Sequence, residues 1–199
     1  MGRVFSRIAI AAGIAAILSL PAAAATTDWQ IDPMHSSAQF AVKHLAISTV
    51  RGAFTSVKGT VQFDDKDITK SVVDVTIDAN SVDTRVAARD KDLRSDHFFH
   101  VEHYPTITFK STKVEQVAPG KLKVTGNLTM HGVTKEVVLD VDGPTSPVKD
   151  PWGNQRMGIS STTTIHRKEF GIGANYGPAM IGDDISITID AEIFHKLDK

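Results

Sequence analysis

The stretch KLKVTGNLTMHGVTKEVVLDVD, residues 121–142, is the part of the sequence from which the fold can be inferred. Apolar and polar residues alternate on both sides of His131-Gly132, as they do in strands with one buried and one solvated face. A short turn containing glycine between two such segments is typical of a hairpin, so we expect the two strands to pair antiparallel. The residues predicted to face inward are Leu122, Val124, Leu128, Met130, Val137, Leu139 and Val141.

The same period of two recurs along most of the chain, in residues 37–42, 61–63, 71–78, 106–109 and 185–194. We count about eight strands, many of them longer than the usual five or six residues. Long antiparallel strands expose unpaired edges, and closure into a barrel removes those edges. The pattern therefore favours an all-β, antiparallel, eight-stranded β-barrel, with a two-sheet sandwich as the alternative.

One segment breaks this period. Residues 81–99 are highly charged, and they contain Ala87 and Ala88, which favour a helix. Asp90 and Arg94 have the i,i+4 spacing of a helical ion pair. We predict a short helix over about residues 84–94, near one end of the barrel.

The first 25 residues differ from the rest of the chain. Two arginines precede an uncharged apolar run over residues 8–20, and an A-x-A cleavage pattern ends near Ala24 or Ala25. This pattern indicates a secretory signal peptide rather than a membrane anchor, because the small-residue site follows the run directly. We expect a cleaved signal peptide at residues 1–25 and a single domain at residues 26–199.

Charge and cysteine content exclude several classes of function. Without the two arginines of that segment, 20 Lys and Arg face 23 Asp and Glu. A nucleic-acid-binding protein presents a basic surface, so this balance argues against nucleic acid as a partner. No cluster of Lys and Arg in the sequence predicts binding to anionic lipid headgroups either. The chain has no cysteine, which excludes disulfides, thiolate metal sites and cysteine nucleophiles.

The stretch HFFHVEHYP, residues 97–105, raises the question of a metal site. His97, His100 and His103 recur every third residue, and zinc accepts three imidazoles. However, Tyr104-Pro105 ends any helix there, and in an extended chain this spacing puts the rings on alternate faces. We favour buried phenylalanines flanked by surface histidines. The alternative is a metal-dependent enzyme or stress protein that uses these histidines.

Catalytic motifs are missing from the sequence. It has no Gly-x-Ser-x-Gly elbow, no glycine-rich phosphate loop and no dinucleotide-binding fingerprint. Paired acids such as Asp64-Asp65 lie next to predicted turns, where solvated carboxylates are common. We therefore expect a protein that is not an enzyme and that has no catalytic cofactor.

The predicted interior is apolar, yet several inward positions hold small residues, among them Gly126, Ser161, Thr163 and Ala191. Small residues that alternate with large ones can fill a tapered barrel, which would give an interaction module with a solid core. They can also leave a tunnel, since eight strands enclose a lumen wide enough for one slender ligand. The pattern alone leaves both interpretations open.

Four sets of motifs, in order along residues 26–199, together resemble the YceI-like family. They are WQID with HS at residues 29–36, SVDT followed by RDKDLRS, DHFF and YP at residues 81–105, GNLT with GVTK at residues 126–135, and DPWG followed by Arg156. Each motif alone is modest, and the ordered set is specific. One departure is His100, where the family usually has an acidic residue.

This resemblance implies a lipocalin-like barrel exported to the periplasm, whose lumen holds a polyisoprenoid or an isoprenoid quinone tail. It also implies a membrane donor or acceptor such as a cytochrome b561-type protein, and a homodimer is compatible with the sequence. The polar head of the lipid would lie at the mouth, near Arg94, Asp83 or His35. The inward alternation gives as candidate lining residues Phe40, Val42, Phe54, Phe63, Val75, Ile77, Phe109, Leu128, Leu139, Ile159, Ile165, Ile187 and Ile189.

Overall fold

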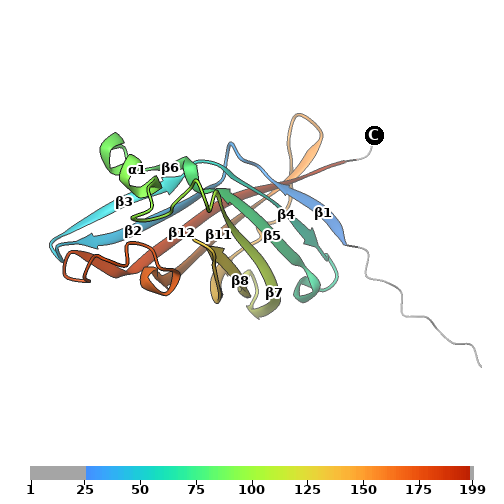
Figure 1. The fold of residues 1–199 in the computed structure, drawn as a ribbon. Helices are drawn as coiled ribbons and strands as arrows, with labels where there is room; N and C mark the ends of the chain where they lie inside the picture. Colours follow the sequence, from blue (N-terminus) through green and yellow to red (C-terminus); the bar gives the residue numbers. More distant parts are fainter. Residues whose placement is uncertain (1–25, 198–199) are drawn as a thin grey trace, which may run out of the picture.

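The computed structural model describes residues 26–197, so the predicted signal peptide at residues 1–25 lies outside the described residues. Figure 1 shows long strands that wrap around a common axis, with one helix near one end. The strands are β1 (Thr27–Ile31), β2 (Ser37–His44), β3 (Ser48–Phe54), β4 (Val57–Phe63), β5 (Val72–Asp78), β6 (Val82–Asp83), β7 (Thr106–Ala118), β8 (Lys121–Met130), β9 (Val133–Asp142), β10 (Val148–Lys149), β11 (Asn154–His166) and β12 (Ile181–Lys196). The helix is α1 (Ala87–Arg94), and short 3₁₀ turns lie at Ile68–Lys70, Ala79–Ser81 and Arg167–Phe170.

Eight of these strands close into a ring, in the order β1, β4, β5, β7, β8, β9, β11 and β12, with β12 pairing back to β1. Every neighbouring pair in the ring is antiparallel. The eight-stranded barrel is thus confirmed, and the two-sheet sandwich is excluded.

The strand β12 is shared between the ring and a projecting hairpin. Its end near Ile193 pairs with β1, whereas its first ten residues, from Ile181 to Asp190, pair with β2. The β2–β3 hairpin therefore extends the wall beyond the ring, toward the left of Figure 1. β6 pairs with the end of β3, and α1 follows it over this end of the barrel.

The helix begins three residues later than predicted. The backbone N–H and the hydroxyl of Thr84 both donate to Oδ1 of Asp90, at 2.8 and 2.5 Å, which fixes the turn before the helix. The predicted ion pair between Asp90 and Arg94 does not form. The guanidinium of Arg94 donates instead to the carbonyl oxygens of Asn80 and Val82.

An ionic cluster on the outer face of the barrel holds the bend between β1 and β2. The guanidinium of Arg156 donates to carboxylate oxygens of Asp32 at 2.6 Å, Glu192 at 2.5 Å and Asp150 at 2.7 Å. Burial would raise the pKa of Asp32, but hydrogen bonds from Arg156 and His35 lower it to about 2. The cluster joins three parts of the chain that are far apart in sequence.

A second arginine, Arg167, is buried at the helix end of the barrel, with 3% of its surface exposed. It donates five hydrogen bonds, all to backbone carbonyl oxygens. The acceptors are Ile172, Gly173, Tyr176, Ile181 and Gly182, at 2.6–2.9 Å. Among the described residues no carboxylate forms an ion pair with it. Arg167 therefore fixes the loop at residues 171–180 through main-chain contacts.

Replacing Arg167 with methionine should lower the free energy of unfolding by about 3 kcal/mol, because five buried carbonyl groups would lose their donor. Urea unfolding followed by circular dichroism measures this change. The neighbouring Lys168 is exposed, so Lys168→Met should change the free energy of unfolding by less than about 0.5 kcal/mol. Equal effects of the two substitutions would contradict the assigned role of Arg167.

The ionic cluster predicts a loss of stability in acid. The pKa of Asp32 is lower in the folded protein than in the unfolded chain. Its contribution to stability is therefore complete above about pH 4 and is lost as the pH falls toward 2. The free energy of unfolding should thus fall less steeply over this range in Asp32→Asn than in the unmodified protein. The exposed Asp28 supplies the control, since Asp28→Asn should leave the slope unchanged.

Candidate ligand-binding site

The interior of the barrel is hollow in its middle. On β5, Val73, Val75 and Ile77 point inward, yet each keeps part of its surface accessible. The buried apolar residues form three separate clusters, whereas a packed domain usually has one continuous core. Inward side chains that stay partly accessible face open space, so the barrel contains a cavity rather than a completely filled core.

The inner chamber has a volume of about 200 Å³ and lies within the ring of eight strands. Its wall is mostly aliphatic and aromatic, and its polar residues, which include Gln39 and Asp190, expose no polar atom to the cavity. The hydroxyls of Ser161 and Thr163 donate to the carbonyl oxygens of Asp140 and Val138, both at 2.9 Å, so their polar atoms are occupied within the wall. A cavity with no free polar groups does not hold ordered water well, and it suits an apolar guest.

The outer chamber has a volume of about 320 Å³ and lies at the end covered by α1. It shares five lining residues with the inner chamber, namely Phe40, Phe54, Met130, Ile165 and Ile187. The two chambers are therefore consecutive, with these side chains between them. Their combined size falls in the lower part of the usual range for ligand pockets, about 300–1,000 Å³.

Two glycines let aromatic rings fill part of the lumen. A Cβ atom at Gly52 would collide with the ring of Phe40, and one at Gly126 would collide with the ring of Phe109. The small residue predicted to widen the lumen at Gly126 instead makes room for Phe109. The ring of Phe40 lies 5.9 Å from that of Phe54, which lies 5.4 Å from that of Phe99. Aromatic side chains thus form part of the boundary between the chambers.

The structure places all thirteen candidate lining residues on the cavity walls. Twelve of them line the inner chamber, and Val42 lines the outer one. Their contact with a ligand remains a prediction. Further residues on the cavity walls, which the alternation pattern did not predict, include Ile31, Val61, Leu93, Phe98, Tyr176 and Met180.

The three residues expected at the mouth do not line either chamber. Arg94 is occupied by two backbone carbonyls, and Oδ1 of Asp83 accepts the backbone N–H of Arg85. His35 belongs to the ionic cluster, where Nδ1 lies 2.9 Å from Oδ2 of Asp32. Contrary to the expectation from sequence, these three side chains thus lie away from the cavity.

The polar side chains beside the outer chamber are Lys43, His44, Arg89, Asp92 and Arg167. They come from β2, α1 and the turn after β11, so no local motif marks them in the sequence. The guanidinium of Arg89 donates to the hydroxyl and the carbonyl oxygen of Thr84. The charged head of a ligand would therefore meet groups that sequence spacing could not identify.

The histidines of residues 97–105 do not converge on one point. Nδ1 of His97 lies 3.0 Å from Oδ1 of Asp92, while the rings of His100 and His103 lie 4.3 Å apart. Phe98 is buried, as expected, and Phe99 is partly buried. Within residues 26–197, the one group with metal-ligand spacing is Asp32, His35 and Glu192, and Arg156 already bonds two of its carboxylates. The described structure therefore gives no support to a metal centre built on these histidines.

Solved structures share this architecture. A Campylobacter jejuni YceI protein matches with a TM-score of 0.70 and 35% identity, over 78% of this chain and 90% of that one. Burkholderia cenocepacia BcnA matches with a TM-score of 0.71 and 22% identity, over 81% and 98%. A polyisoprenoid-binding domain from Saccharophagus degradans matches with a TM-score of 0.62 and 17% identity, over 83% and 97%. The last two show a common fold.

Related sequences cover almost the whole domain. A UPF0312 protein of Vibrio cholerae is 41% identical over 165 residues, which make up 82% of this chain and 87% of the relative. A UPF0312 protein of Pectobacterium atrosepticum is 41% identical over 171 residues, or 86% of this chain and 87% of the relative. The model of the YceI-like domain matches residues 29–193. With its closed barrel and hollow lumen, this chain belongs to the YceI-like family.

Proposed function

We propose that this protein binds the apolar chain of an isoprenoid lipid, a polyisoprenoid or a quinone tail, in the two chambers of its barrel. The observation that carries the proposal is the unfilled, apolar lumen within a closed wall. A soluble polar substrate would find no free hydrogen-bonding group in the inner chamber. The likeness to a polyisoprenoid-binding domain supports the same class of ligand.

The energetics suit a long and slender apolar guest. Burial of one CH₂ group contributes about 0.8 kcal/mol, so an isoprene unit contributes roughly 3–4 kcal/mol. A few units would suffice for tight binding once the cost of ordering the chain is subtracted. The lumen of an eight-stranded barrel is narrow, so it should select the ligand by its cross-section.

The proposed setting is the periplasm, with the protein acting as a carrier or store. The pattern of residues 1–25 supports export, and the barrel would shield an apolar chain from water between membranes. Along residues 26–197 every helix is too short or too polar to cross a bilayer. A membrane protein of the cytochrome b561 type would then donate or accept the lipid. The apolar walls favour binding over catalysis.

Organic extraction of the purified protein, followed by mass spectrometry, tests the ligand class. Protein made in a host that contains prenyl lipids should release a prenyl lipid in near-stoichiometric amount. An extract without any prenyl lipid, or one dominated by straight-chain fatty acids, would refute the proposed ligand.

A substitution that fills the inner chamber tests the site. Ile189 faces the lumen, and the exposed Thr188 next to it faces solvent on the same strand. Ile189→Trp should reduce the extracted lipid by about tenfold or more, since the ring occupies space that the ligand needs. Its melting temperature should stay close to normal because the ring enters a cavity. Thr188→Trp is the matched control, and equal lipid content in both variants would show that the ligand does not lie in this chamber.

A further inference from the structure

A cluster of exposed apolar side chains lies at the end of the barrel where the outer chamber is found. We call it the apolar tip; its central residues are Leu45, Ile47 and Met180, which are 48%, 82% and 48% exposed. The backbone N–H of Leu45 donates to the carbonyl oxygen of Met180 at 2.9 Å, which joins the hairpin to the loop before β12. The exposed neighbours Ala46, Pro178 and Ala179 complete the tip.

The turn at this tip is built from unfavourable residues. Leu45 and Ala46 have φ values of 51° and 58°, and the N–H of Ile47 donates to the carbonyl oxygen of His44 at 3.1 Å. Positive φ at both central positions is the geometry of a type I′ turn, for which Asn and Gly are strongly preferred. The chain instead places apolar side chains there, although a side chain with a Cβ atom is disfavoured at positive φ. Their presence in solvent at this strained position indicates a role other than folding.

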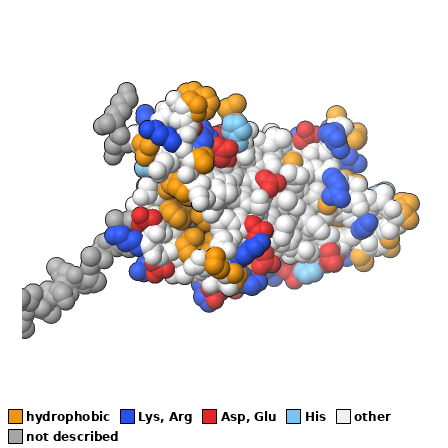
Figure 2. Space-filling view, turned by 180° about the vertical axis from the view of Figure 1, so that it is seen from behind, with side chains coloured by type: hydrophobic (Ala, Val, Ile, Leu, Met, Phe, Trp, Pro, Cys, Tyr) orange, Lys and Arg blue, Asp and Glu red, His pale blue; other side chains and the backbone are white. Residues whose placement is uncertain are grey.

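The charged residues of the hairpin that carries the apolar tip are basic. The β2–β3 hairpin carries Lys43 and Arg51, and residues 33–63 contain no Asp or Glu. The adjoining segment at residues 170–182 has no charged residue. Figure 2 shows hydrophobic side chains at the right end of the molecule, with Lys and Arg side chains beside them. The linear sequence has no Lys and Arg cluster, so only the fold reveals this arrangement.

The nearest acidic groups on β12 lie outside the hairpin and form hydrogen bonds within the protein. Oδ1 of Asp183 accepts the backbone N–H of Lys168 at 3.0 Å, and Oδ1 of Asp184 lies 2.9 Å from Nδ1 of His166. An anionic surface that approached the hairpin would meet the apolar side chains of its turn first, then Lys43 and Arg51. A bilayer with anionic headgroups has the matching order of charge and apolar interior.

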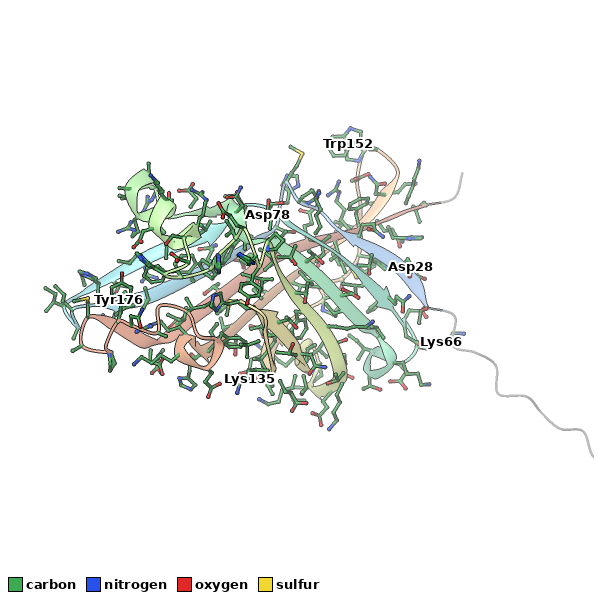
Figure 3. The ribbon with its side chains drawn as sticks, viewed as in Figure 1. Asp28, Lys66, Asp78, Lys135, Trp152 and Tyr176 are labelled. Carbon is green, nitrogen blue, oxygen red and sulfur yellow. The ribbon has the colours of Figure 1, made fainter. Side chains whose placement is uncertain are left out.

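The apolar tip is continuous with the outer chamber. Met180 lines that chamber, together with Lys43, His44, Tyr176 and Ile181 from the same two segments. Figure 3 shows Tyr176 at this end of the molecule, far from Lys66 and Trp152. A membrane that covered the apolar tip would thus lie against the entrance for an apolar chain.

We propose that the apolar tip inserts into the surface of an anionic phospholipid bilayer and sets the mouth of the outer chamber against it. This inference rests on the proposed function, since it names the surface from which the lipid is loaded. Two apolar side chains from a hairpin, with a third from the adjoining loop, would reach the boundary between headgroups and acyl chains. Lys43 and Arg51 would contact the headgroups.

Co-sedimentation with vesicles of phosphatidylethanolamine and phosphatidylglycerol tests the docking surface. The unmodified protein should bind these vesicles, and binding to phosphatidylcholine vesicles should be several-fold weaker. Ile47→Ser should weaken binding by about tenfold, since a side chain that enters the bilayer is lost. The control is Trp152→Ser, because Trp152 is 78% exposed yet lies far from the apolar tip. Equal binding by the two variants would overturn the proposal.

A second variant separates docking from folding. Leu45→Asn combined with Ala46→Gly installs the residues that a type I′ turn prefers. It should unfold at an equal or higher urea concentration and still bind vesicles about tenfold more weakly. Unchanged vesicle binding by this more stable variant would overturn the proposal. So would a dimer in vesicle-free solution that Ile47→Ser dissociates, because the apolar tip would then be a self-association surface.

The outcomes for docking and for the lipid ligand are distinguishable. Protein that contains a prenyl lipid but ignores anionic vesicles would refute docking and leave the proposed function intact. Protein that binds the vesicles through the apolar tip but releases no prenyl lipid would refute the proposed ligand and leave docking intact.

Discussion

The whole structure depends on the closure of the sheet through β12. This strand of sixteen residues pairs with β11 on one side and with β1 and β2 on the other. Closure gives the backbone groups of the ring hydrogen-bond partners within the wall, so the interior is not needed to satisfy them. Because the wall is complete without a packed centre, the middle of the barrel can stay empty and still belong to a stable fold.

Much of the fold follows from local alternation. Val73, Val75 and Ile77 face the lumen as their period of two predicts, and the His131-Gly132 turn joins β8 and β9 as expected. The split between β1 and β2 could not be predicted in this way. It depends on Arg156, which bonds Asp32 across 124 positions of sequence. Such a contact leaves no periodic signal in the sequence. The sequence alone therefore does not show that His35 belongs to the ionic cluster.

In the candidate site, too, local features could be predicted from the sequence, whereas features that depend on distant segments could not. Period two identifies wall residues such as Val75 and Ile189, because inward direction is a local property of a strand. How much space remains is a property of packing between strands: Gly126 accommodates Phe109 rather than a guest. The polar residues beside the outer chamber, such as Arg89 and Lys43, come from segments that only the closed sheet brings together. Their spacing in the sequence therefore could not identify them.

The clamp formed by Arg167 has a consequence for how this binding protein can diversify. The guanidinium donates only to carbonyl oxygens, three in the loop at residues 171–180 and two at the start of β12. Exposed side chains of that loop, such as Ala174 and Asn175, are therefore free to change in size or polarity without loosening the clamp. Tyr176 lines the outer chamber and contributes only its carbonyl oxygen to the clamp, so a change of its side chain leaves that hydrogen bond in place. Mutations in this loop can thus change ligand preference while the backbone that covers the cavity keeps its shape. This loop is therefore a suitable place to engineer new selectivity.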